Sequence, residues 1–146
     1  MTDQTTPVSK VAPIQSPVSS GKKILFIDDD KFLLDMYAVK FRKAGYDIKA
    51  ADSTNAALKI LHDGWQPDAI LADIVMPEMD GLEFVAAVRK EKLAPNAAIV
   101  MLSNQGASED LERAKALNVT SYIVKATTIP SDVLKDVERI FANGKN

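Results

Sequence analysis

Apolar and polar residues alternate along the chain from Lys22 onward, in five short apolar runs separated by amphipathic stretches. Four of the runs are continuously apolar, which is typical of strands covered by helices on both faces, whereas the second run is more polar and suits a sheet edge. The predicted strands span 23–28, 46–51, 68–72, 97–102 and 121–125, and the predicted helices span 31–44, 54–63, 81–92, 107–117 and 130–142. This alternation indicates one parallel sheet with right-handed crossovers.

Residues with strong terminal preferences mark the ends of these helices. Asp30 and Ser53 stand where N-caps are expected, Gly45 and Gly64 follow the first two helices, and Pro130 opens the last one. Asn118 is expected to end the fourth helix in a left-handed conformation. The first helix carries a mostly apolar stripe at helical spacing, formed by Leu33, Met36, Tyr37, Lys40, Phe41 and Ala44.

The first 21 residues differ in composition from the rest of the chain. They are rich in Thr, Ser, Gln and Pro and show neither a helical nor a strand period, so we expect a disordered tail over 1–21. Residues 22–142 then form one domain, followed by a short tail over 143–146. A chain of 146 residues is long enough for one domain with a real core.

Charge and cysteine content exclude several classes of function. A net charge of −2 gives no whole-chain reason to bind nucleic acid or membranes directly. The absence of cysteine excludes disulfides, thiol catalysis and thiolate metal sites. The longest apolar run, 97–102, is too short to span a bilayer, and no secretory signal is visible at the N-terminus. We therefore expect a cytoplasmic protein without membrane insertion.

Reactive side chains follow four of the predicted strands. Asp28 and Asp29 come after the first strand, Asp73 after the third, Ser103 after the fourth and Lys125 at the end of the fifth. In open parallel sheets the functional site lies beyond the carboxyl ends of the strands. We therefore expect all five side chains to meet at one edge of the sheet.

Three carboxylates at one edge require a compensating cation. Two carboxylates about 4 Å apart repel by about 4 kcal/mol at an effective dielectric constant near 20, and Lys125 compensates only one charge. Oxygen ligands without His or Cys favour Mg²⁺, with Mn²⁺ as the alternative. Since Mg²⁺ commonly bridges carboxylates and a phosphate, the sequence predicts a metal-bridged phosphoryl group and a carboxylate nucleophile that forms an acyl phosphate.

Over about residues 22–142 the chain resembles the receiver domain of two-component response regulators. The resemblance rests on I-D-D after the first strand, D-x-x-M-P-x-M-D-G after the third, S after the fourth and Y-x-x-K at the fifth. It implies a flavodoxin-like (βα)₅ fold, a doubly wound five-stranded parallel sheet with strand order 2-1-3-4-5. It also implies a phosphorylatable signalling module with Asp73 as the phosphoacceptor.

The resemblance implies a role for each remaining site residue. Ser103 and Lys125 would contact the phosphoryl oxygens, and Ser103 and Tyr122 would form the conformational switch. The metal ligands would be Asp28, Asp29, Asp73 and the backbone carbonyl of Val75. The only catalysis implied is the module's own phosphoryl transfer and slow self-dephosphorylation.

The resemblance also implies partners. The donor would be a histidine kinase or a histidine phosphotransfer protein, and a downstream protein would bind the face formed by 107–142. Because the chain ends just after the fifth predicted helix, we expect output through contacts in trans. The oligomeric state implied is a monomer or a phosphorylation-dependent dimer.

Three other functions stay open at this point. Ala126 replaces the proline that usually follows the family's lysine, and Asn104 replaces a small residue, which would suit a phosphorylation-independent interaction module. A phosphohydrolase of the haloacid dehalogenase type would need a D-x-D pattern at the first strand, where the acids here are contiguous. A flavodoxin-like cofactor binder would need a Ser/Thr/Gly loop in place of the three aspartates.

Overall fold

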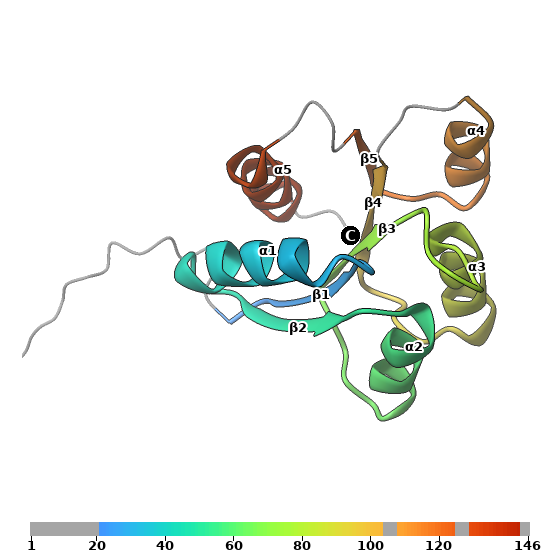
Figure 1. Ribbon diagram of the computed structural model, residues 1–146, viewed down its shortest axis with the longest axis horizontal. Coiled ribbons are helices and arrows are strands. Elements are labelled where there is room, and N and C mark those ends of the chain that lie inside the picture. Colours follow the sequence, from blue (N-terminus) through green and yellow to red (C-terminus); the bar gives the residue numbers. More distant parts are fainter. Residues whose placement is uncertain (1–20, 104–107, 125–128, 144–146) are drawn as a thin grey trace, which may run out of the picture.

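The computed structural model describes residues 21–103, 108–124 and 129–143, and within them the chain forms a five-stranded parallel sheet (Figure 1). The strands are β1 (Lys23–Ile27), β2 (Asp47–Ala51), β3 (Ala69–Asp73), β4 (Ala98–Ser103) and β5 (Ser121–Val124). Their order, β2-β1-β3-β4-β5, confirms the predicted topology and the edge position of β2. The two predicted tails fall outside the described residues, except for Gly21 and Asn143.

Helices cover both faces of the sheet. They are α1 (Lys31–Lys43), α2 (Thr54–His62), α3 (Gly81–Glu91), α4 (Ser108–Ala116) and α5 (Pro130–Ala142). Figure 1 shows α1 and α5 on one face and α2, α3 and α4 on the other, and one buried apolar cluster lies under each group. Every described helix or strand end lies within one residue of its predicted position.

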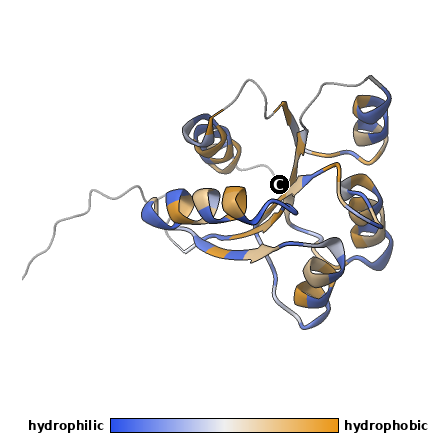
Figure 2. Ribbon diagram, in the orientation of Figure 1, coloured by the Kyte–Doolittle hydropathy of each residue, from blue (hydrophilic) through white to orange (hydrophobic). Residues whose placement is uncertain are grey.

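Burial explains why the central strands are continuously apolar. Every residue of β3 and β4 is buried, whereas three of the five residues of β2 are exposed. Figure 2 shows hydrophobic residues gathered on the sheet and on the helix sides that pack on it. A strand enclosed on both faces must be apolar at successive positions, while an edge strand covered less completely need not be.

The predicted helix termini are present. Asp30 Oδ1 accepts a hydrogen bond from the Leu33 backbone N–H at 3.2 Å, and Ser53 Oγ accepts one from Ala56 at 3.0 Å. Gly64 has a φ of 101° and Asn118 a φ of 56°, so both residues end their helices in a left-handed conformation. These local signals fix where each helix begins and ends.

The predicted apolar stripe of the first helix is partly wrong. Met36 and Lys40 are exposed, and the residues of α1 that are buried against the sheet are Leu34, Tyr37, Ala38 and Phe41. The helix carries apolar residues on its outer side too, so its sequence fits more than one stripe. Packing against β1, β2 and α5 selects the inner one.

Ionisation of the buried Tyr46 hydroxyl is expected to destabilise the protein at high pH. Its ring packs between Phe41 and Phe141, and burial, followed by the charge of Glu138, raises the pKa of the hydroxyl to about 12. An unfolded tyrosine ionises near pH 10, so above that pH the unfolded state releases a proton that the native state keeps. The contribution of Tyr46 to the free energy of unfolding is constant below about pH 10 and is lost as the pH rises to about 12.

We expect Tyr46→Phe to remove this pH dependence, which amounts to about 2–3 kcal/mol. The measurement is urea unfolding of wild type and Tyr46→Phe at intervals between about pH 9 and pH 12. The difference between the two proteins isolates the effect of Tyr46 from that of every other ionisable group. Parallel pH profiles for the two proteins would contradict the expectation.

Candidate functional site

Three aspartates converge at the carboxyl edge of the sheet. Asp28 directly follows β1 and Asp73 ends β3, and these strands are hydrogen-bonded neighbours with Ile27 opposite Ala72. One carboxylate oxygen from each of Asp28, Asp29 and Asp73 lies within 4.8 Å of the other two. The predicted meeting of these three side chains at one edge is therefore confirmed.

The environments of the three carboxylates differ. Asp28 and Asp73 are each only 3% exposed, whereas Asp29 is exposed. Asp28 Oδ1 accepts a hydrogen bond from the Asp30 backbone N–H at 2.9 Å, and the Asp28 N–H donates to the carbonyl of Ala51 at 3.2 Å. Backbone contacts therefore hold Asp28 in place, and Asp29 forms the solvent side of the cluster.

The donor set fits a hard divalent cation. All three groups are carboxylates, which suit Mg²⁺ or Mn²⁺ better than softer metals. Two oxygens on one Mg²⁺ lie at most about 4.2 Å apart, given metal–oxygen distances of about 2.1 Å. Carboxylate oxygens within 4.8 Å of one another need only small side-chain rotations to reach that geometry.

Three other predicted site residues are described, and they lie on β4, on β5 and in the segment after β3. Ser103 ends β4 and is 3% exposed, and the Ile74 N–H donates to the carbonyl of Leu102 at 3.0 Å, so β3 and β4 end together. Tyr122 lies opposite Met101 on β5, partly buried against the apolar cluster under α2, α3 and α4. Val75 lies two residues beyond Asp73 and is exposed. Lys125, Asn104 and Ala126 fall outside the described residues.

The segment after β3 folds back onto Asp73. The Gly81 N–H donates to the carbonyl of Ile74 at 2.8 Å. A Cβ atom on Gly81 would lie only 2.0 Å from the backbone carbonyl oxygen of Asp73. Gly81 therefore permits a close approach between the start of α3 and the end of β3, and this contact was not predicted from the Asp-Gly dipeptide.

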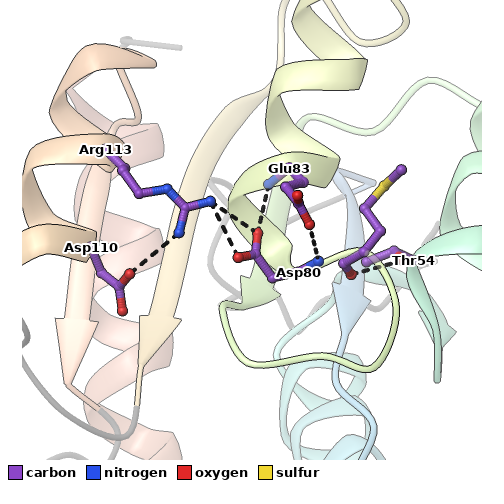
Figure 3. Close-up of polar contacts among 6 residues, drawn as sticks. Thr54, Asp80, Glu83, Asp110 and Arg113 are labelled. Atoms are coloured by element: carbon purple, nitrogen blue, oxygen red, sulfur yellow. Dashed lines mark hydrogen bonds and ion pairs between the residues drawn. The ribbon is translucent and has the colours of Figure 1, made fainter.

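Asp80 anchors the same segment through side-chain contacts (Figure 3). Its Oδ1 accepts from the Glu83 N–H at 2.8 Å, and Glu83 Oε1 accepts from the Asp80 N–H at 2.9 Å, which forms a capping box. Arg113 of α4 donates to both Asp80 carboxylate oxygens at 3.3 and 3.2 Å. Thr54 of α2 donates to the carbonyl of Met79 at 3.1 Å. Neighbouring helices on both sides thus hold the loop that follows Asp73.

Comparison with known families gives a match over most of the chain. Residues 24–137 match the model of the response regulator receiver domain. The phosphate regulon transcriptional regulatory protein PhoB of Pseudomonas aeruginosa is 30% identical over 105 residues, which cover 72% of this chain and 45% of that protein. The chain thus spans less than half the length of this relative.

Solved structures of similar length share the fold. The chemotaxis protein CheY4 of Vibrio cholerae matches with a TM-score of 0.76 and 30% identity over 83% of this chain and 99% of that one. A CheY-like receiver domain protein from Methanospirillum hungatei matches with a TM-score of 0.76 and 25% identity, covering 85% and 96% of the two chains. Within the described residues, the helices are too short or too polar to cross a membrane.

Proposed function

Because the chain belongs to the family of response regulator receiver domains, which are signalling modules of two-component systems, we propose that it accepts a phosphoryl group on Asp73 in a Mg²⁺-dependent reaction. The observation that carries this proposal is the group of carboxylate oxygens from Asp28, Asp29 and Asp73 within 4.8 Å. The receiver unit in this proposal spans 22–142.

The reaction needs one nucleophile and a set of groups that stabilise charge. A carboxylate oxygen of Asp73 attacks the donor phosphorus, a new O–P bond forms, and the bond from phosphorus to the donor's nitrogen or oxygen breaks. The leaving group keeps the electron pair and takes up a proton. Bound Mg²⁺ would neutralise charge on the phosphoryl oxygens, and the groups that would hold it are Asp28, Asp29, Asp73 and the Val75 carbonyl.

Three further residues have roles in this proposal. Ser103 and Lys125 contact the phosphoryl oxygens. The position of Ser103, which is buried at the same sheet edge as Asp73, supports this role. Tyr122 turns inward when Ser103 engages the phosphoryl group. A shift from mostly inactive to mostly active needs about 5.5 kcal/mol of differential stabilisation, toward which a new dianion held by a metal and a lysine contributes.

The partners in this proposal are proteins. The donor is a histidine kinase or a histidine phosphotransfer protein in the cytoplasm, and the downstream partner binds the face of 107–142, which includes α4, β5 and α5. The alternative is an interaction module that works without phosphorylation. It uses the same fold but does not accept a phosphoryl group.

The test is labelling by acetyl phosphate in the presence of Mg²⁺ or of EDTA. We expect a retarded band in phosphate-affinity electrophoresis only with Mg²⁺, and we expect hydroxylamine to remove it, because acyl phosphates react with this nucleophile. Calcium in place of Mg²⁺ serves as the metal control. A chain that stays unlabelled by acetyl phosphate and by kinase donors would instead support the interaction module.

A further inference from the structure

Helix α1 is apolar on two opposite sides. Its inner side packs on the sheet through Leu34, Tyr37, Ala38 and Phe41. On its outer side Phe32, Met36 and Val39 are 73%, 38% and 52% exposed, and these are three of the five large apolar side chains exposed among the described residues. Surface helices usually carry polar residues on the side away from the core. The outer side of α1 therefore has the composition of an interface.

The outer residues follow the spacing of a coiled-coil seam. Phe32, Met36, Val39 and Lys43 are separated by four, three and four residues, as are successive d, a, d and a positions of a heptad. Asp35 precedes one a position and is therefore a g position, and Lys40 follows one d position and is therefore an e position. Together the six residues line a groove of about 470 Å³.

The charged residues on either side of the apolar seam indicate which kind of helix can pack on it and in which direction. Asp35 and Lys40 are five residues apart, about 140° around the helix, so they lie on opposite sides of the apolar seam. Neither side chain has an ion pair among the described residues. In parallel helix pairs a g residue faces the e residue five positions later in the other helix.

We propose that the outer face of α1 is a self-association surface, on which a second copy of this chain packs its own α1 in parallel. Asp35 of each copy would then pair with Lys40 of the other, and Met36 and Val39 would meet their own equivalents at the centre. Antiparallel packing would instead place Asp35 beside Asp35 and Lys40 beside Lys40. Since α1 begins at the edge that carries Asp28 and Asp29, both acidic clusters would lie at the same end of the dimer.

The size of the surface predicts weak association. Helix α1 has 13 residues, fewer than two full heptads, whereas free coiled coils need three or four. Here each helix is already folded on its own domain, so pairing does not carry the cost of helix nucleation. Lys43 at an a position weakens pairing further while favouring one register. We therefore expect a concentration-dependent dimer of the transient class.

Charge reversal tests the pairing. In sedimentation velocity over a concentration series, we expect Asp35→Lys and Lys40→Asp each to weaken association about tenfold, because two ion pairs become two like-charge contacts. The double variant Asp35→Lys/Lys40→Asp should return to nearly wild-type association. Lys90→Asp, on the exposed surface of α3, changes the net charge by the same amount as Lys40→Asp and should leave association unchanged. A double variant no better than the single ones would overturn the parallel pairing.

Disulfide trapping tests the seam, because the chain contains no cysteine. Under mild oxidation we expect Met36→Cys to form a covalent dimer many times faster than Lys59→Cys, which lies on α2 and whose side chain is 77% exposed. Equal rates for the two variants, or a wild-type protein that stays monomeric at the highest concentration, would overturn the proposal. Labelling of Asp73 is measured separately, so failure of this proposal and failure of the phosphoacceptor function are distinguishable.

Discussion

Asp73→Asn is expected to reduce phosphoryl labelling by acetyl phosphate to the level of a donor-free sample. The amide offers no carboxylate oxygen to attack phosphorus, while its size and shape are those of the native side chain. Asp28 and Asp29 stay in the variant, and the hydrogen bond from the Asp30 N–H to Asp28 Oδ1 lowers the nucleophilicity of the buried carboxylate of this pair. We therefore expect no second carboxylate to take over, and phosphate-affinity electrophoresis measures the loss.

Stability separates this loss from a folding defect. Asp73 contributes one of three carboxylates within 4.8 Å, so removing its charge relieves repulsion when no divalent ion is present. Asp73→Asn should therefore unfold at a higher temperature than wild type in EDTA. A labelling defect accompanied by lower stability would point to a damaged fold.

Asp68→Asn is the matched control. It makes the same chemical change just before the amino end of β3, where Asp68 Oδ2 accepts the Lys23 N–H at 2.9 Å and an amide oxygen can do the same. This variant should be labelled as wild type is. Full labelling of Asp73→Asn, or an equal loss in Asp68→Asn, would refute Asp73 as the phosphoacceptor.

The Asp73→Asn variant also distinguishes a receiver domain from a phosphohydrolase. An enzyme of the haloacid dehalogenase type would place its nucleophile at the first strand and would turn over phosphate esters without Asp73. The three strand-one acids here are contiguous, and one of them, Asp30, caps α1. Turnover of an ester that survives Asp73→Asn would favour the hydrolase.

Local and periodic signals account for most of what the sequence predicts. The continuous apolar runs of β3 and β4 follow from burial on both faces, and Asp30 and Ser53 act through hydrogen bonds to residues three positions away. The acidic cluster was predictable because sheet topology alone brings the carboxyl ends of β1 and β3 together. Each of these inferences needs only spacing along the chain.

Contacts that depend on three-dimensional packing could not be predicted from the sequence. Arg113 binds Asp80 across 33 positions, and no residue pattern distinguishes it from an ordinary exposed arginine of α4. Met36 fits an apolar stripe of α1 but lies on the outer side, because two stripes were available and packing chose the other. The Asp-Gly dipeptide predicts a turn, but it does not reveal how close the glycine comes to Asp73.

Gly81→Ala is expected to destabilise the protein by about 3 kcal/mol and to reduce phosphoryl labelling as well. Two effects oppose each other at this first position of α3. Alanine favours a helix over glycine by up to about 1 kcal/mol. The added Cβ, however, would lie 2.0 Å from the Asp73 carbonyl oxygen and 2.9 Å from its carbonyl carbon.

The steric effect prevails because the three nearest neighbours of the added methyl group, which belong to Asp73 and Ile74, are all backbone atoms and cannot rotate away as a side-chain end can. Relief requires β3 and α3 to separate at Asp73, which displaces the proposed nucleophile from Asp28 and Asp29. Gly64→Ala is the control, because Gly64 has a φ of 101° but no atom within 4 Å of an added Cβ. It should cost about 1 kcal/mol through backbone strain alone and leave labelling unchanged. Urea unfolding followed by circular dichroism measures both variants, and a Gly81→Ala protein as stable and as readily labelled as wild type would show that the close approach to Asp73 is not needed.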